Sequence, residues 1–219
     1  MCGRFTLTAS NEEIAETFQV TIPAENWARY NIAPTQNVLA IVGDANGRKK
    51  AGYLRWGLVP SWAKDVNIGH KLINARAETL AEKPAFKRLL PRRRCLIPAN
   101  SFYEWTRQGD AKQPYRIALE KENVFAFAGL WDRWTDGKEE IVSCVIVTTA
   151  PNGFMSPLHD RMPVILSENT QQLWLDAKEK DPSLLTSILV PYVHKMKAYA
   201  VSKAVNSPKN EDASVVEPI

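Results

Sequence analysis

The chain has 219 residues, of which 45% are hydrophobic and 24% charged, and its net charge is +4. This balance is typical of a folded globular protein and excludes a disordered or low-complexity chain. The slight excess of basic residues is compatible with a polyanionic partner but does not require one.

No apolar run approaches the roughly 18 residues that a membrane span needs, so we expect no membrane partner. The first residues are polar and include Arg4, which argues against a secretory signal. We therefore expect a cytoplasmic protein whose thiols stay reduced. The isolated histidines, His70, His159 and His194, give no metal-ligand spacing, so no metal and no organic cofactor are expected.

The predicted elements are mostly short strands with a few helices. Ser10 is a helix cap with Glu13 three residues later, which predicts a first helix. A second helix is expected over 77–90, interrupted or restarted at Pro84, and two more over 167–177 and 181–190. Strand patterns rich in β-branched and aromatic residues cover 37–43, 50–59, 114–120, 124–134, 141–150 and 162–167, with a hairpin turn at 135–140.

The strands outnumber the helices and do not alternate with them, which argues against a doubly wound parallel sheet. The sequence predicts a single α+β domain with an antiparallel, β-barrel-like core flanked by a few short helices. We place the domain at residues 1–210 and a polar C-terminal tail at 211–219.

The first candidate for chemistry is Cys2. If the initiator Met1 is removed, Cys2 carries a free α-amine beside its thiol. Both groups are partly nucleophilic near neutral pH, and together they can trap an aldehyde, first as an imine and then as a thiazolidine ring. The alternative is a small buried residue in a first strand.

Two further residues are candidates for acid–base catalysis. Glu104 lies in the apolar stretch "NSFYEW", where a carboxylate has a raised pKa; the alternative is a surface glutamate on a strand. His159 lies in a Pro-bounded loop before an apolar strand, where it can carry protons; the alternative is a structural pair with Asp160.

Polar and basic residues suggest nucleic-acid contacts. Asn74 and Arg76, two apart in "LINARAETL", share one face if the segment is extended, and the alternative is an ordinary strand-to-helix connection. Trp56 and Trp62 lie beside basic residues, as in single-stranded nucleic-acid channels, although most tryptophans are core residues.

The order of ten short stretches along the chain is informative. They are "MCGRF", "RYNIAPTQ", "RWGLVPSWAK", "LINARAET", "RRCLIPANSFYEW", "QPYRIAL", "FAGLW", "VTTA", "LHDRMPVIL" and "VSKAVNSPKN". From Met1 to about Asn210 the chain resembles the SOS-response-associated peptidase (SRAP) family.

The resemblance implies a compact α+β domain with a barrel-like core and a positively charged cleft for single-stranded DNA. It implies that Met1 is removed autocatalytically and that Cys2 then reacts with the aldehyde of an abasic site. The product is a thiazolidine DNA–protein crosslink that protects the lesion in the DNA damage (SOS) response. The expected partner is single-stranded DNA containing abasic sites, including single-strand–double-strand junctions, bound by a monomer.

The resemblance also implies site residues. The catalytic set is Cys2, Asn74, Glu104 and His159. The DNA-binding set is Arg4, Pro34, Trp62, Arg76, Thr148 and Arg161. Asn100 stands where many members have glycine, so we expect a turn with positive φ there, which asparagine tolerates.

Two rival functions remain open at the level of sequence. One is an N-terminal-nucleophile cysteine peptidase or amidohydrolase, since glutamine amidotransferases also begin Met-Cys-Gly. The other is a non-catalytic single-stranded DNA-binding module, for which Cys2 would be dispensable.

Overall fold

The computed structural model describes residues 2–23, 28–108 and 111–219. Its strands are β1 Phe5–Leu7, β2 Arg29–Ile32, β3 Asn37–Gly43, β4 Lys49–Trp56, β5 Asn74–Arg76, β6 Arg94–Ala99, β7 Ser101–Gln108, β8 Ala111–Leu119, β9 Phe125–Thr135, β10 Glu140–Thr149, β11 Met162–Pro163, β12 Ile165–Leu166 and β13 Met196–Ala200. Its helices are α1 Asn11–Phe18, α2 Glu168–Leu175 and α3 Pro182–Ser187, with 3₁₀ turns at Val66–His70, Ala77–Thr79, Lys203–Asn206 and Ala213–Val216.

A closed barrel forms the centre of the molecule. Its strand order is β10-β4-β3-β6-β9, and β9 pairs with β10 to close the ring. The pairings are antiparallel except that β10 runs parallel to β4, and also to β5 outside the ring. The predicted α+β fold with a barrel-like core is thus confirmed, with this parallel contact as a detail that the sequence did not indicate.

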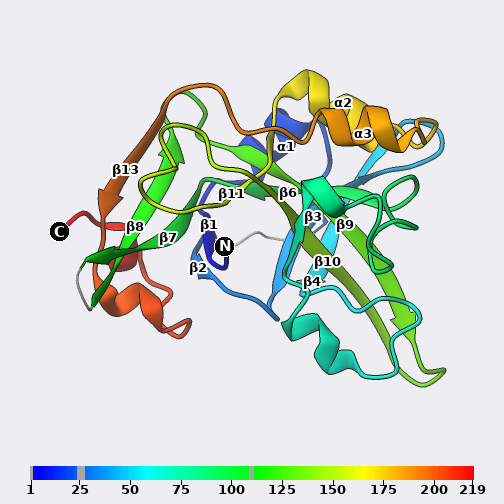
Figure 1. Cartoon of the computed structure of the whole chain (residues 1–219), viewed down its shortest axis with the longest axis horizontal. Coiled ribbons are helices and arrows are strands. Elements are labelled where there is room, and N and C mark those ends of the chain that lie inside the picture. The colour runs from blue at the N-terminus through cyan, green and yellow to red at the C-terminus, as the bar shows by residue number, and fades with distance from the viewer. Residues whose placement is uncertain (1, 24–27, 109–110) are drawn as a thin grey trace.

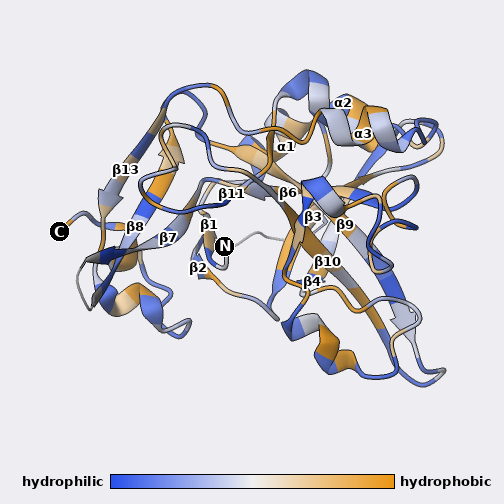
Figure 2. Ribbon diagram, viewed as in Figure 1, coloured by the Kyte–Doolittle hydropathy of each residue, from blue (hydrophilic) through white to orange (hydrophobic). Residues whose placement is uncertain are grey.

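The barrel strands carry the hydrophobic core because their apolar residues face inward. Six consecutive residues of β9, Phe125–Leu130, are buried, and β6 is buried along its whole length. Phe5 contacts Trp56 and Phe127 edge to face, with ring centroids 5.3 and 5.6 Å apart, which joins β1 to the barrel. Figure 2 shows the middle of these strands as hydrophobic and the tip of the β9–β10 hairpin as hydrophilic.

A second sheet has the order β13-β8-β7-β1-β2. In Figure 1, β1 lies between the β7–β8–β13 part of this sheet and the barrel. The start of the chain is therefore placed in the interior of the molecule, where both sheets can contribute side chains to it.

The short helices follow their sequence signals with one exception. Ser10 caps α1 by accepting from the Glu13 amide, and Asp181 caps α3 with Pro182 in its first turn. The predicted helix over 77–90 is wrong: after the 3₁₀ turn the segment continues as separate turns. Pro84 lacks the amide that a continuous helix needs at this position. No helix among the described residues is long and apolar enough to cross a membrane.

The predicted C-terminal tail packs against the rest of the chain. Val215 is buried and belongs to a small cluster with Tyr103, Val201 and Val205. Glu211 forms an ion pair with Arg29 at 2.6 Å. Residues 211–219 are thus part of the folded structure.

Candidate functional site

Cys2 reaches the interior because β1 pairs with β7. Phe5 lies opposite Phe102, and the Tyr103 amide donates to the Arg4 carbonyl at 2.9 Å. Continuing this antiparallel register toward the N-terminus brings Cys2 alongside the next residues of β7, which include Glu104. Cys2 is fully buried.

Asn74 approaches Cys2 from the barrel. β5 runs parallel to β10, with Asn74 opposite Ile146. The Asn74 Nδ2 donates to the Cys2 carbonyl at 2.9 Å, which fixes the backbone of the first residues. Its Oδ1 is buried and has no hydrogen-bond partner among the described residues. This oxygen is thus available to accept a proton from a group that enters the site.

Glu104 and His159 form the second half of the site. Glu104 is only 2% exposed, and its Oε2 lies 3.8 Å from the His159 Nε2. Burial raises the pKa of Glu104 to about 7. Both protonation states of this carboxyl group are therefore populated near neutral pH, as general acid–base catalysis requires.

The backbone around His159 fixes the ring. The His159 amide donates to the Met155 carbonyl, and the Thr106 hydroxyl donates to the Leu158 carbonyl, which ties the loop to β7. The Arg161 amide donates to the His159 Nδ1 at 3.0 Å, so the neutral ring carries its proton on Nε2, toward Glu104. Burial lowers the pKa of His159, which favours this neutral form.

The alternative that the sequence left open for His159 is also present. Asp160 Oδ1 lies 2.9 Å from the Nδ1 of His159, while the Asp160 side chain is 88% exposed. His159 therefore faces a solvent-exposed carboxylate on one side and the buried Glu104 on the other.

The Cys2 thiol is neutral at rest. Burial raises its pKa, and the nearby Glu104 carboxylate raises it further. The structure thus brings Cys2, Asn74, Glu104 and His159 together from four separate segments.

The predicted phosphate contacts differ in their surroundings. Arg76 is exposed at the end of β5. Arg161 is largely buried and pairs with Glu78. The Arg4 Nη1 donates to the Asn31 Oδ1 at 2.7 Å and the Val205 carbonyl at 2.6 Å, so this nitrogen holds the protein together.

The other predicted DNA contacts also differ in exposure. Trp62 is 54% exposed in the turn after β4, and Pro34 is half-buried in the turn after β2. Thr148 is fully buried, and its carbonyl accepts from the Arg161 Nη2 at 2.8 Å. The predicted direct contact of the Thr148 side chain with DNA does not fit this burial; the residue positions Arg161 instead.

The expectation of a positive φ at Asn100 is wrong. Among the described non-glycine residues, positive φ occurs at Gln19 and Thr35. The Asn100 Oδ1 instead accepts from the amides of Thr8 and Ala9, so its side chain fastens the chain after β1. This role keeps the register of β1 and β7, and hence the position of Glu104.

Sequence reasoning missed Asn31 and Glu78. Asn31 is fully buried, and its Nδ2 donates to carbonyls of Val205, Ser207 and Asn210, which fixes the C-terminal segment beside Arg4. Both residues lie inside quoted motifs, "RYNIAPTQ" and "LINARAET", so the motifs held signals that no single residue type revealed.

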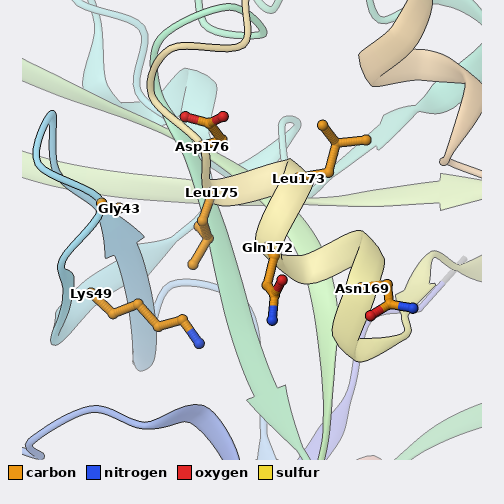
Figure 3. Close-up of a pocket in the computed structure, with 8 residues that line it drawn as sticks. Gly43, Lys49, Asn169, Gln172, Leu173, Leu175 and Asp176 are labelled. Carbon is orange, nitrogen blue, oxygen red and sulfur yellow. The ribbon is translucent and has the colours of Figure 1, made fainter.

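A cavity of about 480 Å³ lies elsewhere, between the end of β3 and α2. Figure 3 shows that Lys49, Asn169, Gln172 and Asp176 contribute to its wall. It contains none of the four candidate catalytic residues and is separate from the candidate site. No group of three or more potential metal ligands occurs in the part of the chain that the structure describes.

The description of the family "SOS response associated peptidase (SRAP)" matches residues 1–208. The chain is 49% identical to the abasic site processing protein YoqW of Bacillus subtilis over 223 aligned residues, with 99% of each chain covered. It is 29% identical to the abasic site processing protein YedK of Escherichia coli, with both chains covered completely. A crystal structure of a protein from Bacteroides thetaiotaomicron is similar with a TM-score of 0.90 at 26% identity, covering 100% of both chains. The chain therefore belongs to the SRAP family.

Proposed function

We propose that this protein recognises abasic sites in single-stranded DNA and links itself to them through Cys2. The observation that carries the proposal is the convergence of the Cys2 backbone, held by Asn74, with the Glu104–His159 pair. The names of the relatives support the same substrate class, since both are abasic site processing proteins.

The chemistry begins after loss of Met1, which lies outside the described residues. We propose that the protein removes Met1 itself, with the Cys2 thiol as nucleophile. The new α-amine then adds to the aldehyde of the ring-opened deoxyribose, and loss of water gives an imine. The thiol adds to the imine carbon, its proton passes to the nitrogen, and the thiazolidine ring closes.

The surroundings of the thiol support this order of steps. Because burial raises the pKa of the Cys2 thiol, the thiolate is scarce in the resting protein. An amine that attacks first creates an electrophilic imine beside the thiol, and ring closure then needs only a local proton acceptor. Glu104 is near enough to raise the thiol pKa electrostatically, and its own pKa of about 7 suits it to accept that proton.

Glu104 and His159 would also open the sugar ring, which requires removal of one hydroxyl proton and protonation of the ring oxygen. In the neutral ring, His159 presents an Nε2 proton toward Glu104, so the two residues can exchange one proton during the reaction. We assign Glu104 as the base and His159 as its proton partner.

The DNA strand would lie over the exposed residues near the site. Arg76 and Arg161 would contact phosphates, while Trp62 and Pro34 would contact bases or sugars. Arg4 is also proposed as a phosphate contact through the donors that Asn31 and Val205 leave over. The cytoplasmic location, the monomeric state and the binding of DNA junctions stay predictions.

The test mixes the mature protein with single-stranded DNA that holds one abasic site, and separates the products under denaturing conditions. We expect an adduct that survives denaturation without reduction, and none with intact DNA. Cys2→Ala keeps an α-amine, so it should give only an imine that borohydride must trap. An unreduced adduct that persists unchanged in Cys2→Ala contradicts the proposal.

The amidohydrolase alternative has a separate readout. If a glutamine analogue labels Cys2 and the protein hydrolyses glutamine, that alternative is favoured. We expect neither result.

A further inference from the structure

Glu78 occupies the hydrogen-bonding edge of Arg161. The Arg161 Nη1 donates to Oε1 of Glu78 at 2.8 Å, and its Nη2 donates to Oε2 at 2.9 Å. This parallel two-bond arrangement is the one that arginine also forms with two oxygens of a phosphate. A phosphate that approaches Arg161 along this edge would meet the Glu78 carboxylate already in place.

The remaining contacts of Arg161 hold it in the protein. Its Nη2 also donates to the Thr148 carbonyl at 2.8 Å, and its side chain is only 13% exposed. Glu78 is 48% exposed. The arginine is therefore fixed on β10, whereas the glutamate can leave toward solvent without breaking the packing around it.

Glu78 is also placed relative to the second arginine. It follows Arg76 by two residues, and the pKa of Glu78 is lowered by the hydrogen bonds from Arg161 and, more weakly, by the charge of Arg76. The carboxylate is thus ionised at neutral pH and lies within the field of both proposed phosphate contacts. One negative charge beside two positive ones reproduces the charge arrangement of a bound phosphate.

We infer that Glu78 is an internal substitute for a DNA phosphate: it neutralises Arg161 in the free protein and is displaced when a strand binds. Its effect is to weaken binding of intact single-stranded DNA, because each phosphate at Arg161 must first replace a bidentate carboxylate. This inference rests on the proposed function, since it takes Arg161 as a phosphate contact.

A different role for Glu78 gives the opposite result. If the carboxylate served to orient Arg161 for the phosphate, its loss would weaken binding of DNA. The sign of the change in affinity therefore separates a competitor from a positioning residue.

The experiment measures binding of intact single-stranded oligothymidine, which has no aldehyde, to wild type and Glu78→Gln over a range of salt concentrations. Glutamine keeps the length and one acceptor oxygen of the glutamate. We expect Glu78→Gln to bind about threefold to fivefold more tightly. The plot of log K against log salt should steepen by up to about 0.7, the value for one added phosphate contact on a single strand.

The matched control is Glu140→Gln. Glu140 pairs with Arg133 at 3.3 Å, both side chains are about half exposed, and the substitution makes the same change in net charge. It lies at the start of β10, roughly 25 Å along the strand from Thr148. In Figure 1 this hairpin extends away from β1. The control should tighten binding by less than about twofold, through net charge alone.

A double substitution completes the test. In an Arg161→Gln background, Glu78→Gln should lose its gain, because the fork that it blocked is gone. The inference is overturned if Glu78→Gln binds as Glu140→Gln does, if it binds more weakly than wild type, or if its gain persists without Arg161. Crosslinking of abasic-site DNA by wild type is scored separately: if the adduct forms and the gain does not, this inference fails and the proposed function stands.

Discussion

The chain holds buried cysteines in two contrasting regions. Cys95 and Cys144 lie in the barrel wall, and Cys2 lies where β1 meets β7; all three are fully inaccessible to solvent. Burial raises the pKa of each thiol. Burial therefore does not distinguish a reactive cysteine from a structural one in this protein.

The neighbours make the difference. The space around Cys95 is filled by Gly129, Ile97 and Val145, which offer it no ionisable partner. Cys2 has an amide on its carbonyl, from Asn74, and the Glu104 carboxylate close enough to shift its pKa. An apolar surround only stabilises the fold, whereas a polar one can take up the protons that a reaction releases.

The largest expected effect tests this contrast directly. Cys2→Ala should abolish the denaturant-resistant adduct, because the thiol that closes the ring is missing. The adduct is measured on denaturing gels after incubation with abasic-site DNA. Cys95→Ala should form the adduct at the wild-type rate; a comparable loss in Cys95→Ala would remove the distinction between the two regions.

The next effect tests the carboxyl group that separates the two regions. Glu104→Gln should slow adduct formation about a hundredfold, the order expected for loss of a general base. The wild-type rate should rise with pH through about 7, as Glu104 ionises, and the variant should lack this step. A variant that keeps the step in its pH–rate profile would show that another group titrates.

The same substitution has a stability readout with a defined sign. The pKa of Glu104 is raised from 4.5 to about 7, so the folded state holds this proton more tightly than the unfolded state does. The free energy of unfolding of wild type should therefore fall as pH rises through this window. Glu104→Gln removes the loss and should gain about 2 kcal/mol relative to wild type across it. Denaturant titrations at the two ends of the window measure the gain, and its absence would contradict the buried position of the carboxyl group.

A third effect should be confined to the barrel wall. A Cβ at Gly129 would lie 2.9 Å from the Cys95 Sγ and 3.1 Å from the Val145 carbonyl oxygen, which is backbone and cannot move aside. Gly129→Ala should thus destabilise the fold by about 1–3 kcal/mol, seen as a lower Tm. Below that Tm, its rate of adduct formation should equal that of wild type. A slower reaction in folded protein would mean that the two regions are coupled.

The smallest effect is expected for Cys144→Ala. The removed sulfur is fully buried among β10 neighbours, and its loss should cost about 1 kcal/mol of unfolding free energy. Adduct formation should not change. A loss of crosslinking by the folded variant would assign Cys144 a role that its surroundings do not explain.

The sequence predicted the strands of the barrel and the identity of the candidate catalytic residues better than their arrangement. The strand over 37–43 coincides with β3, because its apolar run lies between clear turn residues. The meeting of Asn74 with Cys2 depends on the β5–β10 and β1–β7 pairings, which join residues far apart in the chain. Residue spacing carries no information on such pairings, so only the resemblance to the family linked the two.

The errors have physical causes as well. Apolar residues at helical spacing over 77–90 are buried by a series of turns, since Pro84 prevents one continuous helix. Asn100 was interpreted through its backbone, but its buried amide side chain provides the contacts instead. Glu78 was overlooked because a charged residue beside Arg76 resembles any solvated pair until Arg161 is brought to it by the fold.

The most direct test of the central claim is intact mass spectrometry of the protein after incubation with single-stranded DNA that contains one abasic site. We predict a species with Met1 absent and one DNA strand added with loss of one water, and fragmentation that places the added mass on Cys2. An added mass on any other residue, or a protein that has lost Met1 and stays unmodified, would contradict the assignment of Cys2 as the crosslinking residue.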